Sequence, residues 1–263
     1  MGRAIMKRLF LLLLLACTLN VAHAGRVCET KKMSGSNFIA AMNLADKTRS
    51  ALDASKAQVA IISRVGQDLS RYGMRYSHMA YVWRDNAHGR WSVVHELNQC
   101  GTARSALYEQ GLANFFLDDL FAYEAHVFIP TPHSQKKIMA MLASPLARQL
   151  HSARYNMLAY AFSSAYQNSN QWLLETYAAS SSELQIYGRP QAQAWLRLAG
   201  YRPITIHVPA STRLGARLFS ANISFDDHPF GRRAAGQIDT VSVESVLRFV
   251  RAREPQGKEF LVR

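Results

Sequence analysis

Two short runs of aromatic and β-branched residues, at positions 76–83 and 91–97, flank a polar segment at 84–90 that contains Gly89. This pattern predicts a β-hairpin with one of the longer loops. Because strand side chains alternate between two faces, His78 and His95 are neighbours if the faces that carry them coincide. Such a pair is typical of a catalytic base and the residue that orients it. The alternative is two hydrogen-bonded histidines in a half-buried sheet.

The remaining apolar pattern predicts an α+β protein. Helical spacing predicts helices over residues 36–52, 133–150 with a break at Pro145, 190–199 and 242–253, whereas buried or alternating runs predict strands over 57–65, 123–130 and 203–209. Residues 105–119 suit one or two helical turns, and 211–219 are ambiguous. We expect a small antiparallel sheet from the strands near Val59, His78, His95 and Val127, with Ile206 as a further candidate.

A helix start is predicted at Ser169. The turn-prone residues 167–170 (Gln-Asn-Ser-Asn) precede a run from Trp172 to Tyr177 that suits a helix. Asn and Ser are preferred N-caps, which explains these residues without any chemistry. The start of a helix also stabilises an oxyanion or a thiolate, so Ser169 is equally placed for a nucleophile.

Residues 1–24 read as a signal peptide. A basic start and an apolar run from Leu9 to Ala16 precede Ala22-His23-Ala24, a cleavage pattern of small residues, and the run is too short to span a bilayer. We expect a periplasmic or secreted protein. The alternative is a lipoprotein anchored through Cys17, because Leu14-Leu15-Ala16-Cys17 resembles a lipobox. No second long apolar run follows, which excludes a membrane span in the mature chain.

Cysteine count agrees with export. Once Cys17 is removed or lipidated, Cys28 and Cys100 remain, and an oxidising compartment favours a disulfide between them. Neither of the two is a nucleophile candidate.

Length and charge limit the number of domains and the kind of partner. Residues 25–263 show no linker, repeat or charge block, so we expect a single domain. The formal net charge is +13, of which Arg3, Lys7 and Arg8 lie in the signal segment. A basic exported chain favours anionic envelope surfaces, and the absence of a basic-aromatic motif argues against nucleic acid.

The sequence predicts neither a metal nor a cofactor. It has no Gly-rich phosphate loop, dinucleotide fingerprint or His-Glu-x-x-His spacing. Asp226-Asp227-His228 lacks a spaced partner ligand, so we expect a solvated loop there.

The histidine hairpin and the helix start together resemble the circularly permuted, NlpC-type branch of the papain-like superfamily. The residues that carry this resemblance are Ser77-His78 on one strand, Val93-Val94-His95-Glu96-Leu97 on the next, and Asn168-Ser169-Asn170. More of the chain is similar to the bacterial family known as domain of unknown function 2145. The similar stretches are VGQDLSRYGMRYSHMAYVWRD, YEQGLANFFLDD and YQNSNQWLLE.

The superfamily resemblance implies a papain-like site with a nucleophile at a helix start. Carried over, His78 is the base, His95 orients it, and Ser169 takes the nucleophile's position, where the superfamily has Cys. An alcohol must lose its proton during attack, whereas a thiol can be held as a thiolate, so Ser169 is the weaker nucleophile.

Three functions follow from this reading. The first is an envelope hydrolase or acyltransferase that acts on amide or ester bonds through Ser169, His78 and His95. The second is a catalytically inactive protein whose cleft binds a peptidoglycan peptide or an acyl or lipid ligand. The third is a structural envelope protein whose histidines belong to the core.

Overall fold

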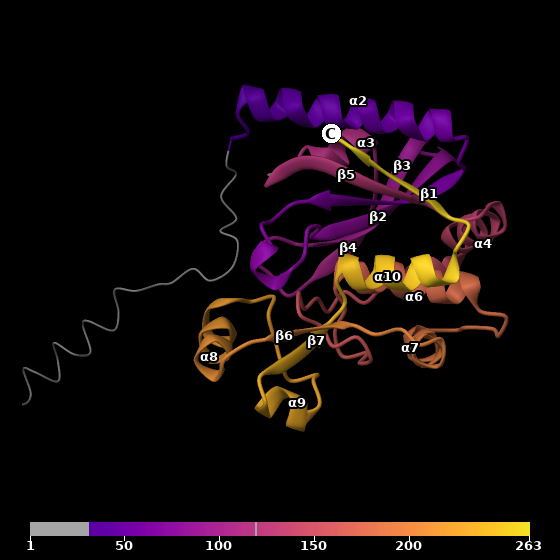
Figure 1. Ribbon diagram of the computed structural model, residues 1–263. Helices are drawn as coiled ribbons and strands as arrows, with labels where there is room; N and C mark the ends of the chain where they lie inside the picture. Colours follow the sequence, from indigo (N-terminus) through magenta and orange to yellow (C-terminus); the bar gives the residue numbers. More distant parts are fainter. Residues whose placement is uncertain (1–31, 119) are drawn as a thin grey trace, which may run out of the picture.

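A six-stranded antiparallel sheet lies at the centre of the fold. The computed structural model describes residues 32–118 and 120–263 (Figure 1). Across the sheet the strands follow the order β4-β3-β2-β1-β5-β8. They are β1 (Val59–Val65), β2 (His78–Asn86), β3 (Gly89–Asn98), β4 (Ser105–Gln110), β5 (Ala122–Ile129) and β8 (Lys258–Val262). The protein is therefore mixed α+β, as its pattern predicts.

Helices cover both faces of this sheet. The helices of the described residues are α2 (Gly35–Ser55), α3 (Leu112–Phe116), α4 (Pro132–Ala143), α5 (Pro145–Gln149), α6 (Ser169–Ser181), α7 (Arg189–Leu198), α8 (Ala210–Phe219), α9 (Phe230–Ala234) and α10 (Val243–Arg253). Helices α2 and α3 pack on one face, whereas α6, with α4 and α10 beside it, packs on the other (Figure 1). A separate two-stranded sheet joins β6 (Ile204–His207) to β7 (Gln237–Thr240).

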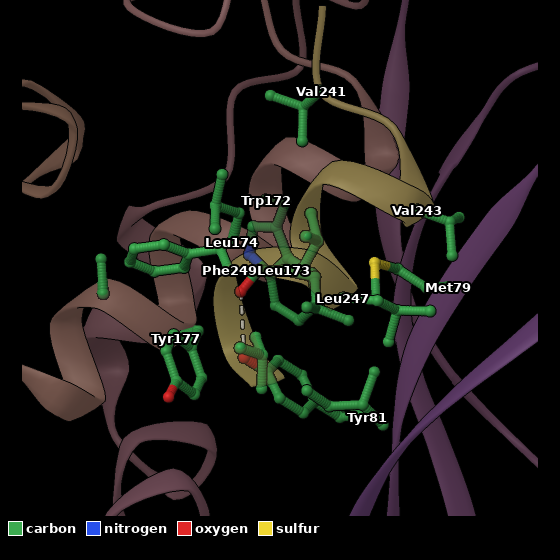
Figure 2. Close-up of a cluster of buried hydrophobic side chains, with 14 of the residues drawn as sticks. Met79, Tyr81, Trp172, Leu173, Leu174, Tyr177, Val241, Val243, Leu247 and Phe249 are labelled. Atoms are coloured by element: carbon green, nitrogen blue, oxygen red, sulfur yellow. Dashed lines mark hydrogen bonds between the residues drawn. The ribbon is translucent and has the colours of Figure 1, made fainter. Parts of the chain in front are cut away.

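The alternation of strand side chains divides the core into two clusters. On β2, Met79 and Tyr81 face α6, whereas Ala80 and Val82 face α2. Figure 2 shows the α6 side, where the Tyr81 hydroxyl donates a hydrogen bond of 2.9 Å to the Leu173 carbonyl. A fully buried apolar side chain such as Met79 or Val82 contributes about 1.5–3 kcal/mol to stability. Apolar burial therefore stabilises the sheet from both faces.

The predicted histidine hairpin is present, but the prediction of a longer loop is wrong, because both strands continue into the segment assigned to the loop. β2 and β3 pair as far as Asn86 and Gly89, which leaves only Ala87 and His88 at the tip. The hairpin is tied to α2, because the buried Trp91 donates from its indole nitrogen to Asp53 at 2.7 Å. The same Asp53 oxygen accepts a hydrogen bond of 2.8 Å from Arg90, a residue that the composition assigns to the turn.

The four predicted helices are confirmed as α2, α4 with α5, α7 and α10. The break at Pro145 is confirmed as well. Ser144 ends α4, and Pro145 stands in the first turn of α5, where its missing N–H costs nothing.

Three expectations need correction. Residues 105–110 form β4 and not a helical turn, because they pair with β3, while only residues 112–116 are helical. Ile206 lies outside the main sheet and pairs with Ile238. His228 is buried and not in a solvated loop, since its two ring nitrogens contact Asp227 at 3.0 Å and the Asp239 carbonyl at 3.1 Å.

The calls on the signal peptide and on Cys17 lie outside the described residues. The predicted disulfide also stays a prediction, because Cys28 lies outside them. In the ranges that the structure does describe, no helix has both the length and the apolar character needed to cross a membrane.

Candidate functional site

The two histidine strands diverge at the end of the hairpin that is remote from its tip. Direct pairing of β2 with β3 ends at Tyr81 and Val94, beyond which residues 78–80 pair with β1 and 95–98 with β4. Helix α6 begins at this divergence. The Asn170 Oδ1 accepts a hydrogen bond of 3.2 Å from the Met79 N–H. The helix start therefore takes the place of a neighbouring strand beside His78.

His78 and His95 are joined across the divergence. The distance between His78 Nε2 and His95 Nδ1 is 2.8 Å, and the ring centroids lie 5.1 Å apart. Phe115 of α3 covers both rings, at centroid distances of 5.9 Å and 5.6 Å. The predicted adjacency of the two imidazoles is thus observed, while their catalytic role stays a prediction.

Burial keeps both imidazoles neutral. It lowers the pKa of His78 well below its usual value and that of His95 to about 3, and the positive charge of Arg64 lowers both further. Arg64 lies opposite His78 on β1 and forms an ion pair of 2.7 Å with Asp118. At neutral pH both rings are uncharged, and each carries a single N–H. One ring therefore donates its N–H to the other.

The start of α6 is fixed by Asn168. Its Oδ1 accepts a hydrogen bond of 2.9 Å from the Gln171 N–H, and its Nδ2 donates to the Val241 carbonyl and to Thr240 Oγ1, each at 3.2 Å. Asn168 is therefore the N-cap, and Ser169 is the first residue of the helix. The Ser169 hydroxyl is not used for capping, which leaves it available for other contacts.

Ser169 lies beside Tyr155 and is almost buried, with 7% of its surface exposed. A side-chain hydrogen bond from Ser169 lowers the pKa of Tyr155, against the larger effect of burial, which raises it. Within the described part of the chain, no hydrogen bond links Ser169 to His78 or His95. The structure thus brings the two histidines into contact on the α3 side of the sheet. Ser169 begins α6 on the opposite side, beside Tyr155, so the predicted meeting of Ser169 with the histidines is not observed.

Glu96 is a polar residue of this region that the sequence reading did not single out. It follows His95 on β3, so its side chain points to the α6 side, and it is fully buried. Neither carboxylate oxygen makes a hydrogen bond of normal geometry among the described residues, although the Ser105 hydroxyl lies near enough to act on its pKa. Burial raises its pKa to about 8, with the Ser105 hydroxyl and Arg189 partly offsetting that effect. At neutral pH Glu96 is mostly a neutral acid, near enough to Tyr155 to act on its pKa.

A signal for Glu96 does exist in the sequence. It is the acidic residue in the otherwise apolar strand Val93-Val94-His95-Glu96-Leu97, where an acid on the face opposite the histidine is unusual.

Other histidines have partners away from this region. His126 Nε2 lies 2.8 Å from Glu259, and His151 Nε2 lies 3.1 Å from Ser105 Oγ. Residues 32–118 and 120–263 contain no group of three or more His, Cys, Asp or Glu side chains arranged to hold a metal ion.

Fold and site together define an α+β protein with a buried histidine pair beside the polar start of a buried helix. The chain belongs to the bacterial family described as "Uncharacterized protein conserved in bacteria (DUF2145)", whose model matches residues 51–250. The match contains both histidine strands and the start of α6. No curated protein and no solved structure matches the chain.

Proposed function

We propose that this protein is an exported cell-envelope hydrolase or acyltransferase with a papain-like site, acting on an amide or ester bond of a wall peptide or a lipid. The observation that supports the proposal is the contact of His78 with His95 where β2 and β3 diverge, together with the start of α6, whose Asn170 accepts a hydrogen bond from the Met79 N–H next to His78. The strands that carry the histidines precede the helix that carries Ser169 in the chain. That is the order of a circularly permuted papain-like protein.

In this proposal Ser169 is the nucleophile. Its oxygen attacks the acyl carbon while His78 accepts the hydroxyl proton, and an ester bond to Ser169 forms as the amine or alcohol leaves with that proton. His95 orients His78 through the 2.8 Å contact. The helix start supplies unpaired N–H groups and the positive end of the dipole to the developing oxyanion. Water or an acceptor alcohol then releases the acyl group.

Two features make this chemistry slow. The low pKa values of His78 and His95 make each imidazole a weak base. Ser169 and the His78 ring also lie on opposite faces of the sheet, so the reaction requires a rearrangement that brings the Ser169 hydroxyl from Tyr155 to His78. We therefore expect a low turnover, with substrate binding driving the rearrangement.

The second candidate is a protein that binds a wall peptide or an acyl chain without cleaving it. The contact between Ser169 and Tyr155 and the burial of both histidines favour it. A purely structural role, with the histidines as core residues, is the third.

Covalent labelling separates the candidates. The purified mature protein is incubated with a fluorophosphonate and read by intact mass, alongside the variants Ser169→Ala and His78→Ala, whose folding is checked by circular dichroism. The proposal predicts one phosphonyl adduct in the wild type and none in either variant. An unlabelled wild type would exclude the serine hydrolase and leave the non-cleaving candidates. A shared thermal midpoint for wild type and His78→Ala would in turn exclude the structural role for His78.

A further inference from the structure

An arginine-lined depression lies between the C-terminal end of α7 and the second half of α10. Its volume is about 390 Å³. It is lined by Ala199, Gly200, Arg202, Arg248, Phe249, Ala252 and Arg253. None of these residues belongs to the site proposed above.

The three arginines that line this depression are exposed, and none of them forms an ion pair with a carboxylate in the described ranges. The nearby acids have other partners. Glu254 accepts hydrogen bonds from Thr131 and Ser134, and Glu259 pairs with Arg251 at 2.7 Å. The depression therefore has three positive charges that the fold does not neutralise.

Contacts within the fold orient two of these side chains. Arg248 Nη2 donates a hydrogen bond of 2.6 Å to the Arg202 carbonyl. The Arg253 guanidinium lies 4.9 Å from the centre of the Trp195 ring and 6.0 Å from that of Phe249. Stacking holds a guanidinium in place while leaving its N–H groups able to bind an anion, so less side-chain freedom is lost on binding.

Helix capping does not explain the whole group. Basic residues in the last turn complement the helix dipole, which accounts for Arg253. Arg248 lies in the middle of α10, and Arg202 follows α7 after a turn at Gly200. Two of the three charges thus have no role in the stability of a helix end.

We propose that Arg202, Arg248 and Arg253 bind a phosphoryl group. Guanidinium forks match the oxygens of phosphate, and the depression has room for a phosphoryl group that is part of a larger molecule. That molecule is either a phospholipid of the envelope or a soluble phosphorylated compound. The site is independent of the proposed chemistry at Ser169.

The test compares two variants of equal charge. Arg248→Gln/Arg253→Gln removes two charges from the depression, and Arg71→Gln/Arg104→Gln removes two exposed charges elsewhere. Arg202→Gln is the third variant, because its side chain makes no hydrogen bond, ion pair or ring contact within the described residues. Sedimentation with vesicles of phosphatidylglycerol in phosphatidylcholine, at about 0.1 M salt, gives the partition constant, and amide chemical shifts of Gly200 and Ala252 follow a titration with inorganic phosphate.

A bound phospholipid predicts that the partition constant falls about tenfold or more in Arg248→Gln/Arg253→Gln, and several-fold in Arg202→Gln, with a much smaller fall in the control. Phosphate shifts without any vesicle binding would identify a soluble phosphorylated compound. Equal losses in the pocket and control variants, with no phosphate shifts, would reduce the effect to net charge and overturn the proposal. So would the absence of both kinds of binding.

Discussion

His95 and Glu96 are adjacent in the chain, and their pKa values are shifted in opposite directions. Burial is the main cause for both, since it disfavours whichever form is charged. It lowers the pKa of His95 to about 3 and raises that of Glu96 to about 8. At neutral pH both side chains are largely neutral, on opposite faces of β3. A residue-scale prediction about pH follows from this pair.

Relative to the variant Glu96→Gln, the free energy of unfolding of the wild type will fall as pH rises from 6.5 to 8. The usual pKa of Glu96 is 4.5, so between 4.5 and about 8 the folded state holds a proton that the unfolded state has released. His78, His95, His126 and His151 act in the opposite sense around pH 6.5, because burial lowers their pKa values as well. These groups are common to the wild type and Glu96→Gln, so the difference between the two proteins isolates the Glu96 effect, about 1–2 kcal/mol over the interval.

Urea unfolding at several pH values checks this prediction. Glu96→Gln keeps the shape and removes the titration of this one group, so the wild type should lose about 1–2 kcal/mol relative to it between pH 6.5 and 8. Glu183→Gln, a change on an exposed side chain, should follow the wild type. Parallel pH profiles for Glu96→Gln and the wild type would show that Glu96 ionises normally in the folded protein.

At the scale of elements, α6 stands apart from the other helices because nearly all its side chains are buried, polar ones included. Its interior face carries Glu175, which Arg189 contacts at 2.7 Å and Gln167 and Gln193 also bond. Its first turn lies against β2 and carries Ser169. Stability and the site therefore depend on the same helix start.

Loss of the Asn168 cap will cost more than loss of an exposed cap. In Asn168→Ala the Gln171 N–H loses its side-chain acceptor and keeps only the Asn168 carbonyl, and the Val241 carbonyl loses a donor. Both groups are in buried surroundings, so about 2 kcal/mol is expected. Ser34→Ala removes the exposed cap of α2, where Ser34 Oγ accepts from the Asn37 N–H, and should cost about 0.5–1 kcal/mol. Urea midpoints measure both, and equal losses would contradict the role given to Asn168.

At the scale of the whole molecule, the C-terminal segment adds the last strand at one edge of the sheet. β8 pairs with β5 and covers the edge that would otherwise be exposed, and the Arg263 carbonyl accepts a hydrogen bond of 2.9 Å from Lys47 on α2. Arg263 and Arg75 both bond Glu124, and with Tyr76 they lower the pKa of that carboxyl to about 2. The end of the chain thus joins the α2 layer to the sheet.

Local pattern predicts the elements whose signals are local. The period-two alternation at residues 76–97 predicts the hairpin and the shared face of His78 and His95, and turn residues at 167–170 predict the start of α6. Pro145 predicts the helix break for the same reason, since proline acts on its own backbone.

Features set by long-range pairing escape the sequence. β4 is a strand because β3 lies beside it, and β8 is a short run with two charged residues whose partner is more than a hundred residues away. Phe115 covers the histidines through α3, and the contact of Ser169 with Tyr155 depends on a segment outside both predicted motifs. No periodicity in the chain encodes these contacts.

The central claim is that His78, His95 and position 169 form one site, and Ser169→Cys tests it most directly. A thiol at a helix start beside an imidazole has a lowered pKa and reacts as a thiolate. The rate of alkylation by iodoacetamide is followed from pH 5 to 9 by intact mass, with the wild type correcting for the native cysteines and His78→Ala added as the second change. We predict an inflection well below pH 8.5 and a rate at pH 6.5 that falls about tenfold or more with His78→Ala. An ordinary thiol profile that does not depend on His78 would contradict the claim.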